Sequence, residues 1–283
     1  MRIDAVLAQG TTTSFEFFPP KSDEESAVLT TTLEELEPLH PSFVSVTYRG
    51  GRESRQRTFD LVTQIQRRGQ ITAMAHLICV GHTRDEMRAI LANYVDAGVE
   101  NVMALGGDVP EDPLDRVSDF THAIELVEMV RETGDFAIGV AAHPHGHPRS
   151  PDLASDRRYL AAKLEAADFA LTQFFFELDE WVHLVEQLGE LGVTKPVVPG
   201  VMPVTTLSGV KRMAEMGAPV PDYLVARLEE ADRRGGPAAV RAQGIEAARE
   251  LCAALLDARA PGLHFYTLNR STATREICRA LLA

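Results

Sequence analysis

The sequence has few cysteines, few basic residues and no long apolar run. Its three cysteines, Cys79, Cys252 and Cys278, lie far apart in apolar stretches and form no CxxC pair. This spacing excludes a disulfide framework and the usual zinc-finger patterns, and it predicts three buried structural thiols. The 28 Lys and Arg residues are outnumbered by 41 Asp and Glu residues, which gives a formal net charge of −13. This balance argues against nucleic acid or an anionic membrane as the main partner, because both require a basic surface.

Targeting segments and several common catalytic motifs are also missing. The segment 1–7 is too short and too charged for a signal peptide, and no apolar run approaches the ~20 residues of a membrane-spanning helix. The patterns GxxxxGK(S/T), HExxH, GxSxG and GxGxxG are absent, so the common phosphate-loop, zinc-protease, hydrolase and dinucleotide fingerprints do not apply. We therefore expect a soluble, cytoplasmic globular protein whose function must be sought in other residues.

Short apolar runs alternate with helical patterns along the whole chain. The first run, 13–18, is stopped by Pro19 and Pro20, which cannot donate to a sheet ladder, and Ser22 to Glu25 predicts a capping box that opens a helix. Seven further runs follow at 43–47, 72–77, 101–105, 136–141, 169–176, 197–202 and 263–267. Eight strands alternating with helices predict an α/β fold, a single (β/α)8 TIM barrel over 1–283. A doubly wound sheet is the competing fold, but its glycine-rich loop after the first strand is absent.

Extra helical material is expected between the seventh and eighth strands. The strand starts are about 30 residues apart until this last interval, which is about twice as long. Helical patterns fill it at 207–215, 222–233 and 238–258, with prolines and Gly235-Gly236-Pro237 between them.

Polar residues are concentrated where the apolar strands end, which is where barrel enzymes place their chemistry. They are Glu16, Thr47, Tyr48, His76, Asp108, His143, Gln173 and the segment 266–270. Carboxylates, hydrogen-bonding groups and aromatic rings that converge on one mouth predict a pocket for an organic ligand.

Two carboxyl groups at these strand ends predict acid and electrostatic chemistry. Glu16 is flanked by Phe15, Phe17 and Phe18, and such apolar surroundings favour a protonated general acid. The alternative is a glutamate that faces outward and pairs with a basic residue on a helix. Asp108 follows Gly106-Gly107 and is placed to remain ionised and stabilise a cation, although Asp is also common in such turns.

Two groups of residues of one type stand out. Three histidines alternate in His143-Pro144-His145-Gly146-His147, and on a strand they would share a face and could bind zinc. The prolines and glycine predict a loop instead, so a polar ligand-binding loop is favoured, with a metal site and a solvated turn as alternatives. Four arginines at 49, 52, 55 and 57 follow the second strand and could meet a phosphate or carboxylate.

Taken together, the strand-end motifs resemble those of one enzyme family. They are FEFFPPK at 15–21, SVTY at 45–48, HL at 76–77, GD at 107–108, TQFFF at 172–176, PGVMP at 199–203 and HFYTLNR at 264–270. In this order they are similar to methylenetetrahydrofolate reductase. The resemblance implies a (β/α)8 barrel that reduces 5,10-methylene-tetrahydrofolate to 5-methyl-tetrahydrofolate, usually through FAD that NADH or NADPH has reduced.

The resemblance also implies residue roles. Glu16 matches the general acid and Asp108 the aspartate that stabilises the iminium cation. Residues that match substrate-binding positions are Gln173, Phe175, Tyr266 and Arg270, and those that match cofactor-binding positions are Thr47, His76, Gly107, His143, His147, Asp156 and Lys163. With Arg49 and Arg52, the cations Lys163 and Arg270 are candidates to meet the anionic ligands; no metal is implied.

Departures from the family pattern cluster on the flavin side. Gly106 stands where the family commonly has Arg, His143 and His145 replace an aromatic residue and a Glu, and Arg49 and Arg52 stand in a loop that lacks the usual Gly-Ala run. The preferred hypothesis is therefore an enzyme without flavin, in which NADH or NADPH gives its hydride directly to the substrate. The alternatives are the same reaction through bound FAD in ping-pong fashion, a metal-dependent hydrolase that uses the histidine loop, and a non-catalytic folate-binding protein.

Overall fold

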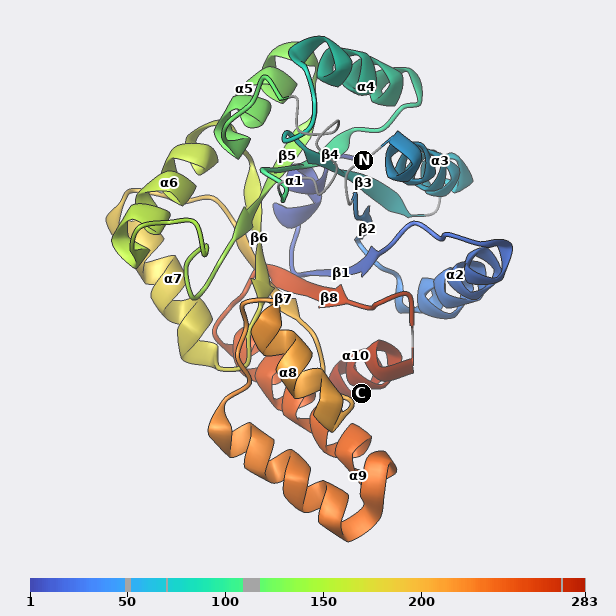
Figure 1. The fold of residues 1–283 in the computed structure, drawn as a ribbon, viewed down its shortest axis with the longest axis vertical. Helices are drawn as coiled ribbons and strands as arrows, with labels where there is room; N and C mark the ends of the chain where they lie inside the picture. Colours follow the sequence, from blue (N-terminus) through green and yellow to red (C-terminus); the bar gives the residue numbers. More distant parts are fainter. Residues whose placement is uncertain (49–51, 70, 109–117, 271, 283) are drawn as a thin grey trace.

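The computed structural model describes residues 1–48, 52–69, 71–108, 118–270 and 272–282. Eight parallel strands close into a barrel in sequence order, with β8 pairing back onto β1 (Figure 1). Their bounds are β1 Thr12–Phe17, β2 Phe43–Val46, β3 Thr72–Ile78, β4 Asn101–Leu105, β5 Ala137–Ala142, β6 Phe169–Phe174, β7 Val197–Val201 and β8 Gly262–Tyr266. The predicted (β/α)8 TIM barrel is confirmed, and the doubly wound sheet was wrong because the strand order never reverses.

Helices surround the strands on all sides of the ring in Figure 1. Their bounds are α1 Ile3–Leu7, α2 Asp23–Leu36, the 3₁₀ turn Glu37–Leu39, α3 Arg52–Arg68, α4 Arg84–Asp96, α5 Ala123–Thr133, α6 Leu153–Ala166, α7 Leu178–Glu190, α8 Leu207–Glu215, α9 Asp222–Asp257 and α10 Thr272–Leu282. The extra helices predicted between β7 and β8 are α8 and α9. The last two predicted helices are joined as α9, which is broken at Gly235 and at Gly236, whose φ of +62° favours glycine.

Side chains alternate between the two faces of each strand, which separates two cores. Phe15 and Phe17 point outward into the main core between the strands and the helices. A smaller core fills the lower barrel interior, where Ile3 and Leu7 of α1 pack beneath inward-facing residues. Those residues are Phe43, Met74, Met103, Phe169, Leu171 and Val198. The barrel thus has an apolar floor, and polar inward-facing residues lie toward the strand ends.

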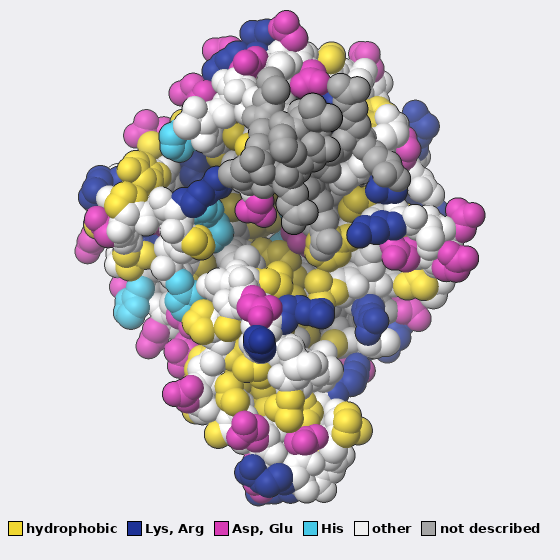
Figure 2. Space-filling model, in the orientation of Figure 1, with side chains coloured by type: hydrophobic (Ala, Val, Ile, Leu, Met, Phe, Trp, Pro, Cys, Tyr) yellow, Lys and Arg dark blue, Asp and Glu magenta, His cyan; other side chains and the backbone are white. Residues whose placement is uncertain are grey.

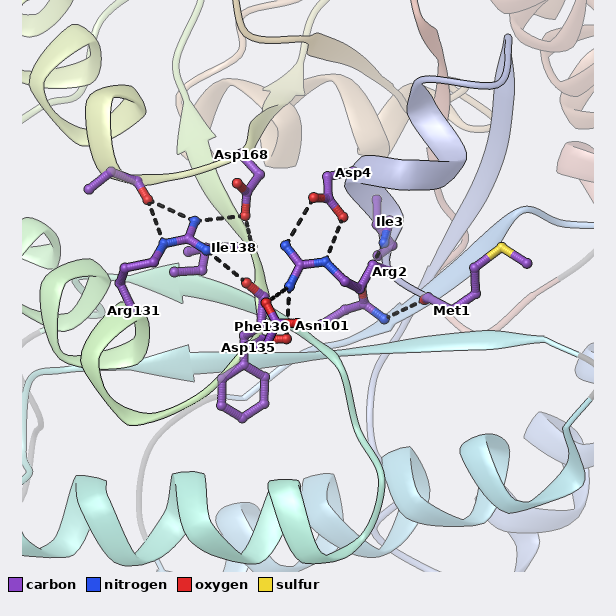
Figure 3. A network of polar contacts seen from close by, with 11 residues as sticks. Met1, Arg2, Ile3, Asp4, Asn101, Arg131, Asp135, Phe136, Ile138 and Asp168 are labelled. Atoms are coloured by element: carbon purple, nitrogen blue, oxygen red, sulfur yellow. Dashed lines mark hydrogen bonds and ion pairs between the residues drawn. The ribbon is translucent and has the colours of Figure 1, made fainter.

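A polar network fixes α1 to the amino-terminal ends of β4 and β5 (Figure 3). Arg2 forms two hydrogen bonds with Asp4 and one with the carbonyl of Asp135. The Asn101 side chain accepts from the backbone N–H of Ile3 at 2.7 Å, and Arg131 donates to Asp168 at 2.8 Å. This face is opposite the carboxyl ends of the strands, where barrel enzymes place their active sites. We therefore infer that the network contributes to stability and not to the reaction.

The three cysteines are free and buried, as predicted. Among the described helices, none combines the length and the apolar character needed to cross a membrane.

Candidate active site

The Glu16 carboxyl lies inside the upper barrel. The residue is only 7% exposed, and its Oε2 lies 3.5 Å from Nε2 of His76 on β3 and 3.6 Å from Nε2 of His264 on β8. Glu16 therefore faces the barrel interior, and the alternative of an outward glutamate paired with a helix was wrong. A buried carboxyl in a polar pocket is suited to proton transfer.

The expected surroundings of Glu16 require a correction. Phe15 and Phe17 are fully buried, but they lie in the core outside the barrel because neighbouring residues of a strand point to opposite faces. The groups that face Glu16 are two imidazoles and the ring of Tyr266. The Glu16 carboxyl is removed from water because it is buried inside the barrel. Phe15 and Phe17 cover only the opposite face of β1 and do not contact the carboxyl side.

Residues at the end of β8 and just after it form hydrogen bonds with β1 and β6 around Glu16. The Thr267 hydroxyl donates to the backbone carbonyl of Glu16 at 2.6 Å, and Asn269 exchanges two hydrogen bonds with the backbone of Phe18. The Tyr266 hydroxyl donates to the Thr172 carbonyl at 2.7 Å. Burial, with a smaller effect of Glu16, raises the pKa of Tyr266 well above its usual value, so the phenol is neutral. These bonds hold the end of β1 in one position.

Asp108 is exposed and follows the end of β4. The residue before it, Gly107, has a backbone conformation that favours glycine. Gly107 has φ of +82°, and a Cβ there would come within 2.7 Å of Val80. The Arg149 guanidinium donates to the Gly107 carbonyl at 3.1 Å and would lie 3.3 Å from a Cβ on Gly106. A basic group from the β5–α6 loop thus occupies the place beside Gly106.

A buried ion pair organises the histidine loop. Asp156 accepts from the backbone N–H of His147 at 2.9 Å and from Arg157, its own neighbour, at 3.0 Å. Arg157 also donates to the carbonyls of His143 and Pro144. One arginine and one aspartate of α6 therefore fix both ends of the loop.

His143 and His147, the first and last histidines of this loop, are neutral. The rings of His143 and His147 meet edge to face with centroids 4.8 Å apart. Burial, with contributions from His147 and Lys163, lowers the pKa of His143 to about 4, and burial also lowers that of His147. Burial likewise lowers the pKa of Lys163, whose amino group donates to the Ala141 carbonyl at 3.2 Å.

The stability of the protein is expected to fall in mild acid through His143. Its pKa is about 4 in the folded protein and about 6.5 when unfolded, so its contribution is present above pH 6.5 and is lost as pH falls toward 4. The drop in Tm between pH 7.5 and pH 5 should be a few degrees smaller in H143N. Exposed His183 gives the matched control, H183N, whose drop should equal that of the unmodified chain. An equal drop in all three proteins would contradict this role.

The third histidine of the motif points elsewhere. His145 Nε2 lies 3.0 Å from Glu180 on α7, and this hydrogen bond raises the pKa of His145. Within the described ranges, no group of three or more His, Cys, Asp or Glu side chains is arranged to hold a metal ion. Alternation does not hold through the turn, so the three imidazoles do not converge.

Other predicted residues lie in different places. Gln173 lies half-buried at the end of β6, and its Oε1 accepts from the N–H of Phe174. Phe175, which follows the end of β6, is 1% exposed and packs in the outer core. Arg270 is exposed beside a groove of about 620 Å³ that Lys21 also lines. Arg49 and the side chain of Arg52 lie outside the described residues.

Several buried polar atoms around the mouth have no hydrogen-bond partner within the described residues. They are the hydroxyl oxygens of Ser45 and Thr47 and the Nε2 atoms of His76 and His264. Buried polar atoms are normally paired, so this group indicates a place where a ligand or water binds. Figure 2 shows a central hollow over the ring of strands, with apolar side chains inside it and histidines on the side of α6 and α7.

Sequence reasoning missed four residues of this site: Ser14, Arg149, Arg157 and His264. Ser14 and His264 could have been found, since barrel closure pairs β1 with β8 and inward positions repeat every second residue. Arg157 gave no signal, because an Arg beside an Asp on a helix is usually a surface pair.

The sequence is similar to known proteins over almost its whole length. The sequence model described as "Methylenetetrahydrofolate reductase" matches residues 2–282. The 5,10-methylenetetrahydrofolate reductase of Pectobacterium carotovorum is 32% identical over 270 residues, covering 95% of this chain and 89% of the relative. Methylenetetrahydrofolate reductase (NADH) 1 of Arabidopsis thaliana is 34% identical over 95% of this chain and 48% of its own length.

A solved structure shares the fold at low sequence identity. It is an uncharacterized protein from Clostridium thermocellum that binds two copies of 5-methyl-5,6,7,8-tetrahydrofolic acid; its TM-score is 0.70 at 11% identity, covering 99% of this chain and 97% of that one. This likeness supports the barrel alone. The family match over almost the whole length carries the assignment: this chain belongs to the methylenetetrahydrofolate reductase family.

Proposed function

We propose that this protein reduces 5,10-methylene-tetrahydrofolate to 5-methyl-tetrahydrofolate with NADH or NADPH as the hydride source. The observation that carries the proposal is the buried Glu16 carboxyl, which faces into a mouth lined with unpaired polar atoms. The family to which the chain belongs supports the reaction, and the name of the Arabidopsis relative supports NADH as one donor.

In the proposed mechanism Glu16 acts as the general acid. The methylene carbon bridges N5 and N10 of the folate, and the product keeps this carbon on N5. Glu16 therefore donates its proton to N10 as the bond from carbon to N10 breaks, which leaves an iminium cation on N5. Asp108, at the end of β4, offsets the positive charge, and hydride addition to the carbon completes the methyl group. Overall, one hydride from the nicotinamide and one proton from Glu16 enter the product.

Two groups of residues would bind the two substrates. Gln173, Tyr266 and Arg270 would contact the folate from β6 and β8. Residues at the other side of the mouth would hold the dinucleotide: Thr47, His76, Gly107, His143, His147, Asp156 and Lys163. Neutral imidazoles at 143 and 147 can accept as well as donate hydrogen bonds, while Arg149 adds positive charge for a phosphate.

Direct hydride transfer from the nicotinamide is the preferred route. The support for this route is the set of residues that depart from the family pattern, among them Gly106 and His145. The His145 side chain pairs with Glu180 and so points away from the proposed cofactor position. In this route the nicotinamide ring lies against the folate, and the reaction needs no second cofactor.

The alternative route through FAD also has support in the structure. The unpaired Thr47 hydroxyl and His76 imidazole suit the hydrogen-bonding groups of a flavin, and Arg149 supplies a basic group beside Gly106. Thr47, His76, Asp156 and Lys163 would then hold the flavin, which would supply the hydride for the reduction.

An absorbance spectrum of the purified protein, followed by an assay without added FAD, separates these proposals. Oxidation of NADH or NADPH that depends on methylene-tetrahydrofolate, in protein without flavin absorbance, supports direct transfer. A stoichiometric flavin spectrum supports the FAD route instead. A non-catalytic folate-binding protein would oxidise no nucleotide in either case and would overturn the proposed reaction.

A further inference from the structure

Gly106 has no role in the proposed mechanism, and its own backbone does not require glycine. Of the two glycines that follow β4, only Gly107 has a positive φ, of +82°. A Cβ on Gly106 would have one described atom within 4 Å, Nη2 of Arg149 at 3.3 Å. Among the described residues, a side chain at position 106 would therefore press first on this guanidinium.

The Arg149 guanidinium lies against this pair of glycines and has donors to spare. Its Nη2 donates to the Gly107 carbonyl at 3.1 Å, which uses one of the five N–H groups of an arginine side chain. The residue is exposed, and within the described part of the chain no other group accepts from its side chain. The remaining N–H groups are therefore open to a ligand at the mouth of the barrel.

A braced β-turn holds Arg149 in this place. The backbone N–H of Ser150 donates to the His147 carbonyl at 2.8 Å, which closes a turn over residues 147–150. Asp156 on α6 accepts from the backbone N–H of His147 and from the Ser150 hydroxyl, both at 2.9 Å. Both ends of the turn are thus bonded to one helix, so the position of the arginine is fixed by the fold.

The same turn determines which nitrogen of His147 carries the proton. The backbone N–H of Arg149 donates to Nδ1 of His147 at 3.1 Å. A backbone N–H can only donate, so Nδ1 carries a lone pair and the proton of the neutral ring is on Nε2. Burial and the charge of Arg149 lower the pKa of His147, which agrees with a neutral ring. The turn therefore presents an imidazole N–H and a guanidinium, which are both donors.

The charges around the turn suit an anion. The charge of Asp156 is offset by Arg157, which donates to it at 3.0 Å on the side of α6. Asp108 is the nearby exposed carboxylate, and it has a smaller effect on the pKa of His147 than Arg149 has. A planar guanidinium matches the paired oxygens of a phosphate, and its hydrogen bonds to such an ion are strong.

We propose that Arg149 and His147 bind the diphosphate of the dinucleotide, and that Gly106 makes room for this arginine. The inference rests on the proposed function, in which a dinucleotide occupies this side of the mouth. Arg149 donates to the phosphate oxygens from its guanidinium, and His147 donates from Nε2. The family pattern commonly has its arginine at position 106, whereas in this chain the charge comes from the β5–α6 loop. NADH, NADPH and FAD all contain adenosine diphosphate, so the assignment holds for either route of hydride transfer.

Binding of ADP-ribose, measured by isothermal titration calorimetry on protein freed of any bound flavin, tests the site without any turnover. ADP-ribose has the diphosphate but no nicotinamide. R149M keeps the backbone N–H that bonds to His147 and should raise Kd by about tenfold or more, the usual effect of losing hydrogen bonds to a charged group. R158M removes an exposed arginine of α6 and should leave Kd unchanged. An unchanged Kd in R149M, or no binding of ADP-ribose to the unmodified protein, would overturn the proposal.

A second probe, 2′-phospho-ADP-ribose, identifies the phosphate that Arg149 contacts. The proposal predicts the same fold-change in Kd for both probes in R149M. A loss confined to 2′-phospho-ADP-ribose would place Arg149 at the 2′-phosphate and would overturn the assignment to the diphosphate.

The double variant G106R/R149M tests the link between the two positions. It returns an arginine to position 106 when the place beside it is empty, and it should recover most of the affinity for ADP-ribose that R149M loses. A double variant that binds no better than R149M would refute the role of Gly106. Lack of reductase activity in unmodified protein that binds ADP-ribose would instead refute the proposed function, so the two failures are distinguishable.

Discussion

Replacement of Glu16 by Gln is expected to lower kcat by roughly 10²-fold or more, the usual contribution of a general acid. The amide has nearly the same shape and can still donate a hydrogen bond, but it has no proton to give to N10. The interaction is made only in the transition state, so KM for the folate should change far less than kcat. Steady-state kinetics with methylene-tetrahydrofolate and NADH or NADPH measure both constants.

Two variants make this test specific. E16D keeps an acid one methylene farther from the folate and should recover part of kcat. Glu186 is exposed on α7, and E186Q should leave kcat and KM unchanged. Near-normal turnover of E16Q would mean that another group protonates the folate.

Replacement of Arg157 by Met is expected to lower the free energy of unfolding by about 3–5 kcal/mol, the usual cost of leaving a buried charge without its partner. The Arg157 side chain is 4% exposed and its partner Asp156 is 8% exposed. Methionine fills much of the volume but supplies none of the bonds to Asp156, Gln187 and the carbonyls of His143 and Pro144. Urea denaturation followed by circular dichroism measures the loss.

The adjacent arginine gives a matched control. Arg158 is exposed and, within the described part of the chain, donates only to the hydroxyl of Ser155. We therefore expect R158M to change the free energy of unfolding by less than about 1 kcal/mol. Equal stability of R157M and R158M would show that the buried pair does not organise the loop. Because the loop carries His143 and His147, R157M should also weaken dinucleotide binding.

The fold was largely predictable because its signals are local. Each predicted strand lies within two residues of an observed one, since apolar runs and the prolines and glycines around them depend on neighbours in the chain. The sequence also indicated the break at Gly235 and Gly236. The structure differs only in that the two predicted helices follow each other directly across this break, as α9.

The site was less predictable because its contacts join distant segments. The burial of Glu16 was expected, but the identity of its neighbours depends on the pairing of β1 with β8, about 250 residues later in the chain. The packing of Phe175 in the outer core was not foreseen, and the register shift between β6 and β7 leaves no mark in the sequence. Arg149 reaches Gly107 from another loop, a contact that no local pattern indicates.

The central claim is that NADH or NADPH reduces methylene-tetrahydrofolate in this barrel and that the buried acid Glu16 supplies the proton. The most direct test is to incubate the purified protein with 5,10-methylene-tetrahydrofolate and NADH or NADPH and to measure 5-methyl-tetrahydrofolate by mass spectrometry. The account predicts one 5-methyl-tetrahydrofolate for each nucleotide oxidised, and a rate that falls by about 10²-fold in E16Q. Absence of the methyl product with either nucleotide, both without flavin and with added FAD, would contradict it.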